Sequence, residues 1–168
     1  MSISIVEYQP AFREAVRRLN EAWLSAYFVV EPSDRVQLGD PETHILQKGG
    51  YLCFAATDEA EVVGVGALMW VKPGVYELSK MAVDPAFQGC GIGRRIAVRC
   101  LQEARQRGAS RVILYTNSRL QAAIHLYESL GFVSVPLREA PYGRADRRME
   151  LQLAQPSFVA EQRNPSQA

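Results

Sequence analysis

The sequence predicts an α/β fold in which a mixed, mostly antiparallel central sheet of about six to seven strands is flanked by helices. Three β-prone runs follow one another at residues 51–57, 62–71 and 75–83, with short turns between them. Consecutive strands joined by short turns indicate an antiparallel meander. A helical pattern at residues 91–107 then leads to an almost continuous apolar run at 111–116. A helical crossover into a buried strand is typical of parallel pairing, so we expect residues 111–116 to lie beside residues 75–83.

The first third of the chain predicts one strand followed by helices. Residues 3–8 alternate well enough for a strand. Across residues 12–27 the apolar side chains recur at steps of three and four, which makes one helix face, and Pro32 ends this pattern. Two short helical segments are expected within residues 33–47 because the sequence Gly39-Asp40-Pro41 interrupts them.

The last third of the chain predicts a helix between strands. Ser118 and Gln121 form an S-x-x-Q capping box, which predicts a helix that begins at Ser118 and ends at Gly131. Strands are expected at residues 132–136 and 147–153, where β-prone side chains return.

Length and composition predict a single domain over residues 1–154. The chain has 168 residues, of which 48% are apolar, and this is enough for one sizeable core. Residues 155–168 are rich in Gln, Ser, Pro and Asn, a composition that predicts a disordered tail.

Charge, hydropathy and cysteine usage exclude several classes of partner. A net charge of +1 gives no reason to expect nucleic acid, and no apolar run approaches the roughly twenty residues that a bilayer requires, so no membrane partner is expected. Cys53, Cys90 and Cys100, with His44 and His125, show neither metal-ligand nor disulfide spacing. We therefore expect no metal, free thiols and a cytoplasmic location.

A glycine-dense loop at residues 88–93 carries the strongest functional signal. It follows a strand that stops at Asp84-Pro85, and it opens directly into a helical pattern. Glycines at alternate positions let several N–H groups point inward, and a helix start adds unpaired donors and positive dipole charge. The loop therefore predicts an anion site. It lacks the Gly-Lys-Ser/Thr of a P-loop, and Arg94 stands where the Rossmann fingerprint requires glycine.

Two motifs together resemble the GNAT superfamily of N-acetyltransferases. The spacing Q-x-x-G-x-G/A of Gln88, Gly91 and Gly93 is similar to the loop that binds the pyrophosphate of acetyl-CoA in that family. The A-x-x-L-Y-x-x-x-G-F pattern of residues 123–132 is similar to a second family motif. Each motif alone is weak, but each follows its own strand, and the resemblance covers residues 3–154. It implies acetyl-CoA as co-substrate and a primary amine as acceptor.

The resemblance implies two residues for proton transfer. Glu77 corresponds to a glutamate that acts as the general base, directly or through water; the alternative is a carboxylate at a solvated strand edge. Tyr127 corresponds to a tyrosine beside the CoA sulfur, where a phenol can protonate the departing thiolate. Its alternative is a core aromatic, because it lies on the apolar stripe of its helix.

The resemblance also implies where acetyl-CoA binds. A backbone N–H near Met81, where the strand bulges, would bind the oxyanion, and Arg94 would meet the pyrophosphate rather than form solvated helix surface. Asn117 can cap the next helix, bind the pantetheine arm, or do both. The expected contacts are Met81, Ala82, Val83, Gln88, Gly89, Cys90, Gly91, Ile92, Gly93, Arg94 and Asn117.

The amine acceptor is the least specified part of the prediction. Trp23 and Tyr27 on the first helix, and Tyr142 and Arg144 on the late loop, are the candidates; their alternatives are core packing and a solvated loop. An arginine fork beside aromatic walls suits a small amine that carries a carboxylate, such as an amino acid. A protein N-terminus or lysine, a non-catalytic acyl-CoA sensor and a structural protein with a decayed site are the alternatives. The oligomeric state stays open, with a homodimer as one option.

Overall fold

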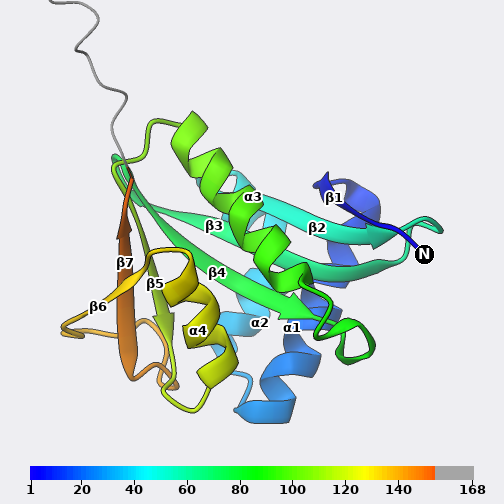
Figure 1. Ribbon diagram of the computed structural model, residues 1–168. Helices are drawn as coiled ribbons and strands as arrows, with labels where there is room; N and C mark the ends of the chain where they lie inside the picture. The colour runs from blue at the N-terminus through cyan, green and yellow to red at the C-terminus, as the bar shows by residue number, and fades with distance from the viewer. Residues whose placement is uncertain (154–168) are drawn as a thin grey trace, which may run out of the picture.

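A mixed seven-stranded sheet organises the protein in the computed structural model, which describes residues 1–153 (Figure 1). The strand order is β1-β2-β3-β4-β5-β7-β6. The strands are β1 Ile3–Glu7, β2 Tyr51–Thr57, β3 Val62–Lys72, β4 Val75–Val83, β5 Arg111–Thr116, β6 Val133–Val135 and β7 Arg147–Gln152. The predicted α/β class is confirmed. The predicted disordered tail, residues 155–168, lies outside the described residues.

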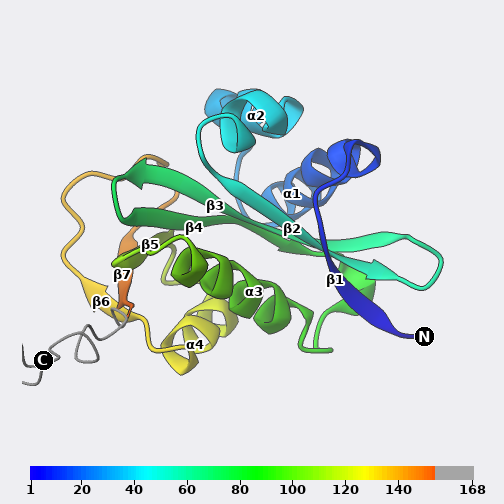
Figure 2. The same ribbon diagram turned by 90° about the horizontal axis from the view of Figure 1, so that it is seen from above.

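Helices cover both faces of this sheet, as Figure 2 shows from above. One face carries α1, α2 and a π-helical turn, and the opposite face carries α3 and α4. Their bounds are α1 Arg13–Tyr27, α2 Pro32–Gly39, the π-helical turn Glu42–Leu46, α3 Ile92–Gln106 and α4 Gln121–Ser129, with short 3-10 turns at Pro10–Phe12 and Pro85–Phe87. No helix among residues 1–153 is long and apolar enough to cross a bilayer.

The pairing of β4 creates an opening in the middle of the sheet. β2, β3 and β4 form the predicted antiparallel meander, and β4 pairs with β5 in parallel, as expected. That parallel pairing covers only Val75↔Arg111 to Glu77↔Ile113. From Leu78 onward, β4 has no ladder partner on its β5 side among the described residues, so the two strands separate immediately after Glu77. Its backbone groups there are available to a ligand.

A β-bulge lies in the same stretch of β4. The register with β3 passes from Ala67↔Ser79 to Val65↔Ala82, so β4 contains an extra residue there. Lys80 has φ of 56°, a left-handed conformation that is uncommon for a residue other than glycine. Bulges increase local twist and redirect side chains. The bulge therefore sets which way the β4 side chains point where the sheet opens.

Close packing of α3 fixes the position of the glycine loop against the sheet. Cys53 on β2, and Ile96 and Cys100 on α3, are completely buried in the core on this face. Gly66 on β3 lies directly beneath the helix, and a Cβ there would collide with Ile96 and Met81. The glycine permits the close approach that holds the first turn of α3 at the end of β4.

One sequence prediction about the fold is wrong. Helix α4 begins at Gln121, with Leu120 as its N-cap and no side-chain cap, so Ser118 and Gln121 form no capping box. The Ser118 N–H and hydroxyl donate instead to the Asp146 carboxylate, over 2.8 and 2.7 Å. A carboxylate is a strong acceptor, and it engages both groups. The interaction ties the β5–α4 turn to the loop before β7.

Candidate active site

One continuous cavity of about 560 Å³ extends from the glycine loop to the region around Glu77. Its walls come from α1, the bulged half of β4, the glycine loop, the β5–α4 region and the loop between β6 and β7. The predicted residues that line it are Trp23, Glu77, Met81, Ala82, Val83, Gln88, Gly89, Gly91, Ile92, Gly93, Arg94, Asn117, Tyr127, Tyr142 and Arg144. Folding therefore brings most of the predicted site together.

The glycine loop forms an open anion cradle at one end of the cavity. Gly89 and Gly91 have φ of 79° and 76°, and Gly91 is the N-cap of α3 without a side-chain hydrogen bond. The first N–H groups of a helix have no intrahelical partner, and here no cap occupies them. A Cβ on Gly91 would meet nothing within 4 Å, so this position requires glycine for its left-handed backbone and borders open space.

Arg94, Cys90 and Asn117 have different positions around this end of the cavity. Arg94 lies at the rim, where its guanidinium donates to the Ser129 hydroxyl of α4 over 2.7 Å. Cys90 is exposed and is not part of the cavity lining. The Asn117 amide donates to the Arg144 carbonyl over 2.7 Å, and its oxygen accepts from the Arg119 N–H over 2.9 Å. Because Leu120 is the N-cap of α4, the expectation that Asn117 caps this helix is wrong.

Glu77 lies at the last parallel pair of β4 and β5, where the strands separate. Its side chain is buried, with 9% exposed, and it accepts a hydrogen bond from the Tyr142 hydroxyl over 3.3 Å. Burial raises the pKa of Glu77, while Lys80, Ser79 and Tyr142 oppose that rise. The alternative of a carboxylate at a solvated edge does not hold. A buried carboxylate with a raised pKa, placed where the strands separate, is a candidate general base.

Tyr127 faces the cavity from α4 and also packs in the core. Its ring meets Phe132 edge-on, with the centroids 5.9 Å apart, and burial raises the pKa of Tyr127 to about 12. The phenol therefore stays protonated at neutral pH. Tyr127 therefore packs against the core and also lines the cavity.

The predicted acceptor residues divide into two groups. Trp23 and Tyr142 line the cavity, and burial raises the pKa of Tyr142 well above its ordinary value. Tyr27 packs against Trp23, with ring centroids 5.7 Å apart, but it is exposed and lies outside the lining of this cavity. The aromatic pair on α1 thus contributes one wall residue.

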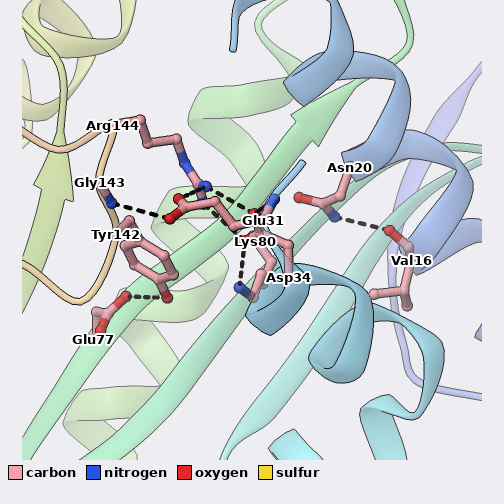
Figure 3. A network of polar contacts seen from close by, with 9 residues as sticks. All are labelled: Val16, Asn20, Glu31, Asp34, Glu77, Lys80, Tyr142, Gly143 and Arg144. Atoms are coloured by element: carbon pink, nitrogen blue, oxygen red, sulfur yellow. Dashed lines mark hydrogen bonds and ion pairs between the residues drawn. The ribbon is translucent and has the colours of Figure 1, made fainter. Parts of the chain in front are cut away.

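Arg144 is not the free cationic fork that the sequence suggested. Its guanidinium makes two parallel bonds to Asp34, of 2.9 and 3.0 Å, and a third of 3.0 Å to Glu31 (Figure 3). Gly143 also donates to Glu31 over 3.4 Å. Burial alone would raise the pKa of Asp34, but the hydrogen bonds from Arg144 and from the Glu31 backbone lower it. Asp34 is therefore ionised, and it engages the arginine that was expected to bind the acceptor's carboxylate.

Sequence reasoning missed two charged residues of the cavity, Asp34 and Lys80. Asp34 is completely buried, and its carboxylate accepts from the Glu31 N–H over 2.9 Å in a capping box that starts α2. The sequence Glu31-Pro32-Ser33-Asp34 signals a helix start, but not its contact with a loop 110 residues away. In the sequence Lys80 is one of several polar residues of a predicted strand, and only the register with β3 reveals the bulge that contains it.

The family is established by comparison with known proteins. Residues 16–132, more than half of the chain, match the acetyltransferase (GNAT) family. The protein belongs to this family, which confirms the resemblance read from the two motifs. In the Escherichia coli protein described as "Uncharacterized N-acetyltransferase YjgM", 31% of 144 residues are identical, over 82% of this chain and 83% of that protein.

Other similar proteins match in part or in fold. The mycothiol acetyltransferase of Mycobacteroides abscessus is 45% identical over 74 residues, which are 44% of this chain and 25% of that protein. The chain thus spans about a quarter of the length of that curated relative. A GNAT acetyltransferase from Staphylococcus aureus Mu50 has a TM-score of 0.82 at 19% identity, over 91% of this chain and all of that one. The Salmonella typhimurium yncA structure, "with its cofactor Acetyl-CoA", has a TM-score of 0.70 at 24% identity, over 94% and 97%.

Proposed function

We propose that this protein transfers an acetyl group from acetyl-CoA to the primary amine of a small molecule. The observation that carries this proposal is the continuity of the cavity, which joins the uncapped N-terminus of α3 to the buried Glu77 carboxylate. One end fits an anionic phosphate group, and the other end contains a base. Family membership supports this pairing of functions, and the similar Salmonella structure holds acetyl-CoA.

Acetyl-CoA would lie across the opening between β4 and β5. Its pyrophosphate would bind the N–H groups of the loop from Gln88 to Arg94, where left-handed glycines leave the helix amides open. Its pantetheine arm would follow the free edge of β4 at residues 81–83, with Asn117 on the opposite side. Cys90, which is outside the lining, would contribute through its backbone alone.

The chemistry requires three groups in sequence. Glu77, directly or through water, takes a proton from the acceptor ammonium, and the free amine attacks the thioester carbonyl carbon. A backbone N–H near Met81, at the bulge, stabilises the tetrahedral oxyanion. The C–S bond then breaks, and Tyr127, protonated at neutral pH, donates its proton to the departing thiolate. The proton that remains on the acetylated nitrogen passes to the Tyr127 phenolate, directly or through water. The products are an N-acetyl amine and CoA.

Loop contacts at the Glu77 end of the cavity favour a small molecule over a polypeptide. Arg144 and Gly143 of the loop before β7 bond to Glu31 and Asp34 at the start of α2, so two distant segments meet across this side. A protein N-terminus or lysine would have to enter past these contacts. A non-catalytic acyl-CoA sensor would have no use for a buried base beside the cavity. The cytoplasmic location and the homodimer stay predictions.

An acceptor screen tests this proposal. The protein is incubated with acetyl-CoA and a panel of amino acids, polyamines and short peptides, and free CoA is measured with a thiol reagent. We expect acetyl-CoA consumption that depends on a small amine. Release of CoA only with peptides or proteins would support the polypeptide alternative. Tight acetyl-CoA binding without turnover on any amine would support the sensor.

A further inference from the structure

Lys80 is a buried cation whose hydrogen-bonding capacity is unused. Its side chain is 4% exposed, and its ammonium has no hydrogen-bond partner among residues 1–153. The nearest carboxylate oxygen, on Asp34, is 3.9 Å away, beyond hydrogen-bond distance, and the ring of Tyr142 lies 5.1 Å from the ammonium. An ammonium has three donors, and burying them without acceptors is costly. Lys80 also lines the cavity, so a ligand there can supply the missing acceptor.

The neighbouring charges distinguish Lys80 from Arg144. Asp34 accepts two bonds from Arg144, which compensates both charges and uses one edge of the guanidinium (Figure 3). Lys80 receives only the longer-range attraction of Asp34 and Glu77, and burial lowers its pKa. Among the described residues of this network, Lys80 is therefore the cation whose charged group makes no hydrogen bond. The cost of its burial is met by an anionic oxygen more fully than by a neutral group.

Lys80 and Glu77 share one neighbour, which places them at the same part of the cavity. The Tyr142 hydroxyl donates to Glu77, and the ammonium of Lys80 lies over the ring of the same tyrosine. Both charged residues come from β4, three positions apart, and Lys80 lies in the bulge itself. A base and a buried cation beside one aromatic ring match a ligand that carries an amine and an anionic group.

We propose that Lys80 is the acceptor-specificity residue, and that its ammonium binds a carboxylate on the amine acceptor while Glu77 receives the amine proton. This inference rests on the proposed acetyl transfer and narrows its substrate class to amines of the amino-acid type. The carboxylate-binding role that the sequence suggested for Arg144 thus passes to a residue on β4. Arg144 acts as a positioning residue that holds Asp34, and Asp34 in turn attracts the Lys80 ammonium.

The test compares Lys80→Met with a matched control, Lys72→Met, on the exposed end of β3. Each variant is measured with standard L-amino acids and with the α-carboxamides of the same amino acids. We expect Lys80→Met to raise KM for the amino acids by about tenfold to a hundredfold, with the carboxamides changed by less than about threefold. Comparing each variant with wild type on the same acceptor cancels the different amine pKa values of the two series. The acetyl-CoA affinity should be unchanged, and Lys72→Met should match wild type throughout.

Calorimetry separates this inference from the proposed function. Amino acids and carboxamides are titrated into the protein saturated with CoA, which requires no turnover. Wild type should bind amino acids more tightly than their carboxamides, and Lys80→Met should lose that preference. If this binding preference is found but no amine is acetylated, the proposed acetyl transfer is defeated and the carboxylate site is supported. Two results would overturn the role of Lys80. One is turnover in which Lys80→Met changes KM equally for the amino acids and their carboxamides, and the other is a wild-type protein that binds both equally well. If Lys80→Met does not fold, Lys80→Gln replaces it, and the wild-type preference for amino acids over carboxamides remains a test of the carboxylate site.

Discussion

The two ends of the cavity are built in different ways. The glycine-loop end is formed by one contiguous stretch, residues 88–94, and it presents the uncapped N–H groups at the start of α3. The acceptor end is made of charged side chains from α2, β4 and the loop before β7, namely Asp34, Glu77, Lys80 and Arg144. A contiguous backbone site can be read from spacing in the sequence. A site assembled from distant side chains depends on which of them pair with each other.

The largest expected effect is at the acceptor end. Glu77→Gln keeps the shape of the side chain but removes the base, so turnover at neutral pH should fall by roughly a hundredfold to ten-thousandfold. The acetyl-CoA affinity should change little, because the proposed pyrophosphate site lies at the other end of the cavity. Steady-state kinetics over a pH series measure this. Wild-type turnover across the whole series would remove Glu77 from the mechanism.

Breaking the Arg144–Asp34 pair should lower the stability of the protein, because Arg144 pairs with Asp34 and is not free to bind the acceptor. Arg144→Met leaves the completely buried Asp34 carboxylate with the Glu31 N–H and, as its one nearby cation among the described residues, the more distant Lys80, and we expect a loss of about 3 kcal/mol in the free energy of unfolding. Urea denaturation measures this loss.

The control for the buried pair is Arg13→Met, which removes an exposed partner of Asp40 and should cost less than about 1 kcal/mol. Adding Asp34→Asn to Arg144→Met should recover part of the lost stability, because the uncompensated charge is then absent. Equal small losses in Arg144→Met and Arg13→Met would contradict a structural role for Arg144.

At the glycine-loop end, Gly91→Val should weaken acetyl-CoA binding on the order of a hundredfold. A β-branched residue at φ of 76° is strained, and its side chain would enter the open space where phosphate oxygens approach the amides. Gly108→Val is the matched control, since Gly108 has φ of 73°, also borders open space and follows the other end of α3. Both variants should lose similar stability, and calorimetry should show lost affinity only in Gly91→Val. Equal affinities would place the pyrophosphate elsewhere.

The smallest expected effect is a shift in pH dependence. The hydrogen bond from Tyr142 helps to lower the pKa of Glu77 against the effect of burial. Tyr142→Phe removes it, so the pKa of Glu77 should rise further. Because the base acts when deprotonated, the acid limb of the kcat/KM profile should move to higher pH. Tyr8→Phe, which loses a 2.6 Å bond to Glu42 on another part of the molecule, should leave the profile unchanged. An unmoved limb in Tyr142→Phe would separate that hydroxyl from the base.

The secondary structure was largely predictable because its signals are local. The bounds of β2, β4 and β5 agree with the predicted runs, since alternation and turn residues act within a few positions. The start of α4 was not predictable in the same way. Ser118 and Gln121 have the spacing of a capping box, but the Ser118 hydroxyl donates instead to Asp146, 28 residues away.

The glycine loop, the antiparallel meander, the parallel pairing of residues 75–83 with 111–116 and the family could be predicted from the sequence alone, because each depends on backbone preferences or on short spacings. Only the tertiary structure decided the roles of the charged residues. From the sequence, Arg144 was expected to be an unpaired cation, but in the folded protein it pairs with Asp34. Lys80 has the sequence context of an ordinary strand lysine, but it lies in a β-bulge and is buried. The energy of a charge depends on burial and on its partners, and these come from segments far apart in the chain.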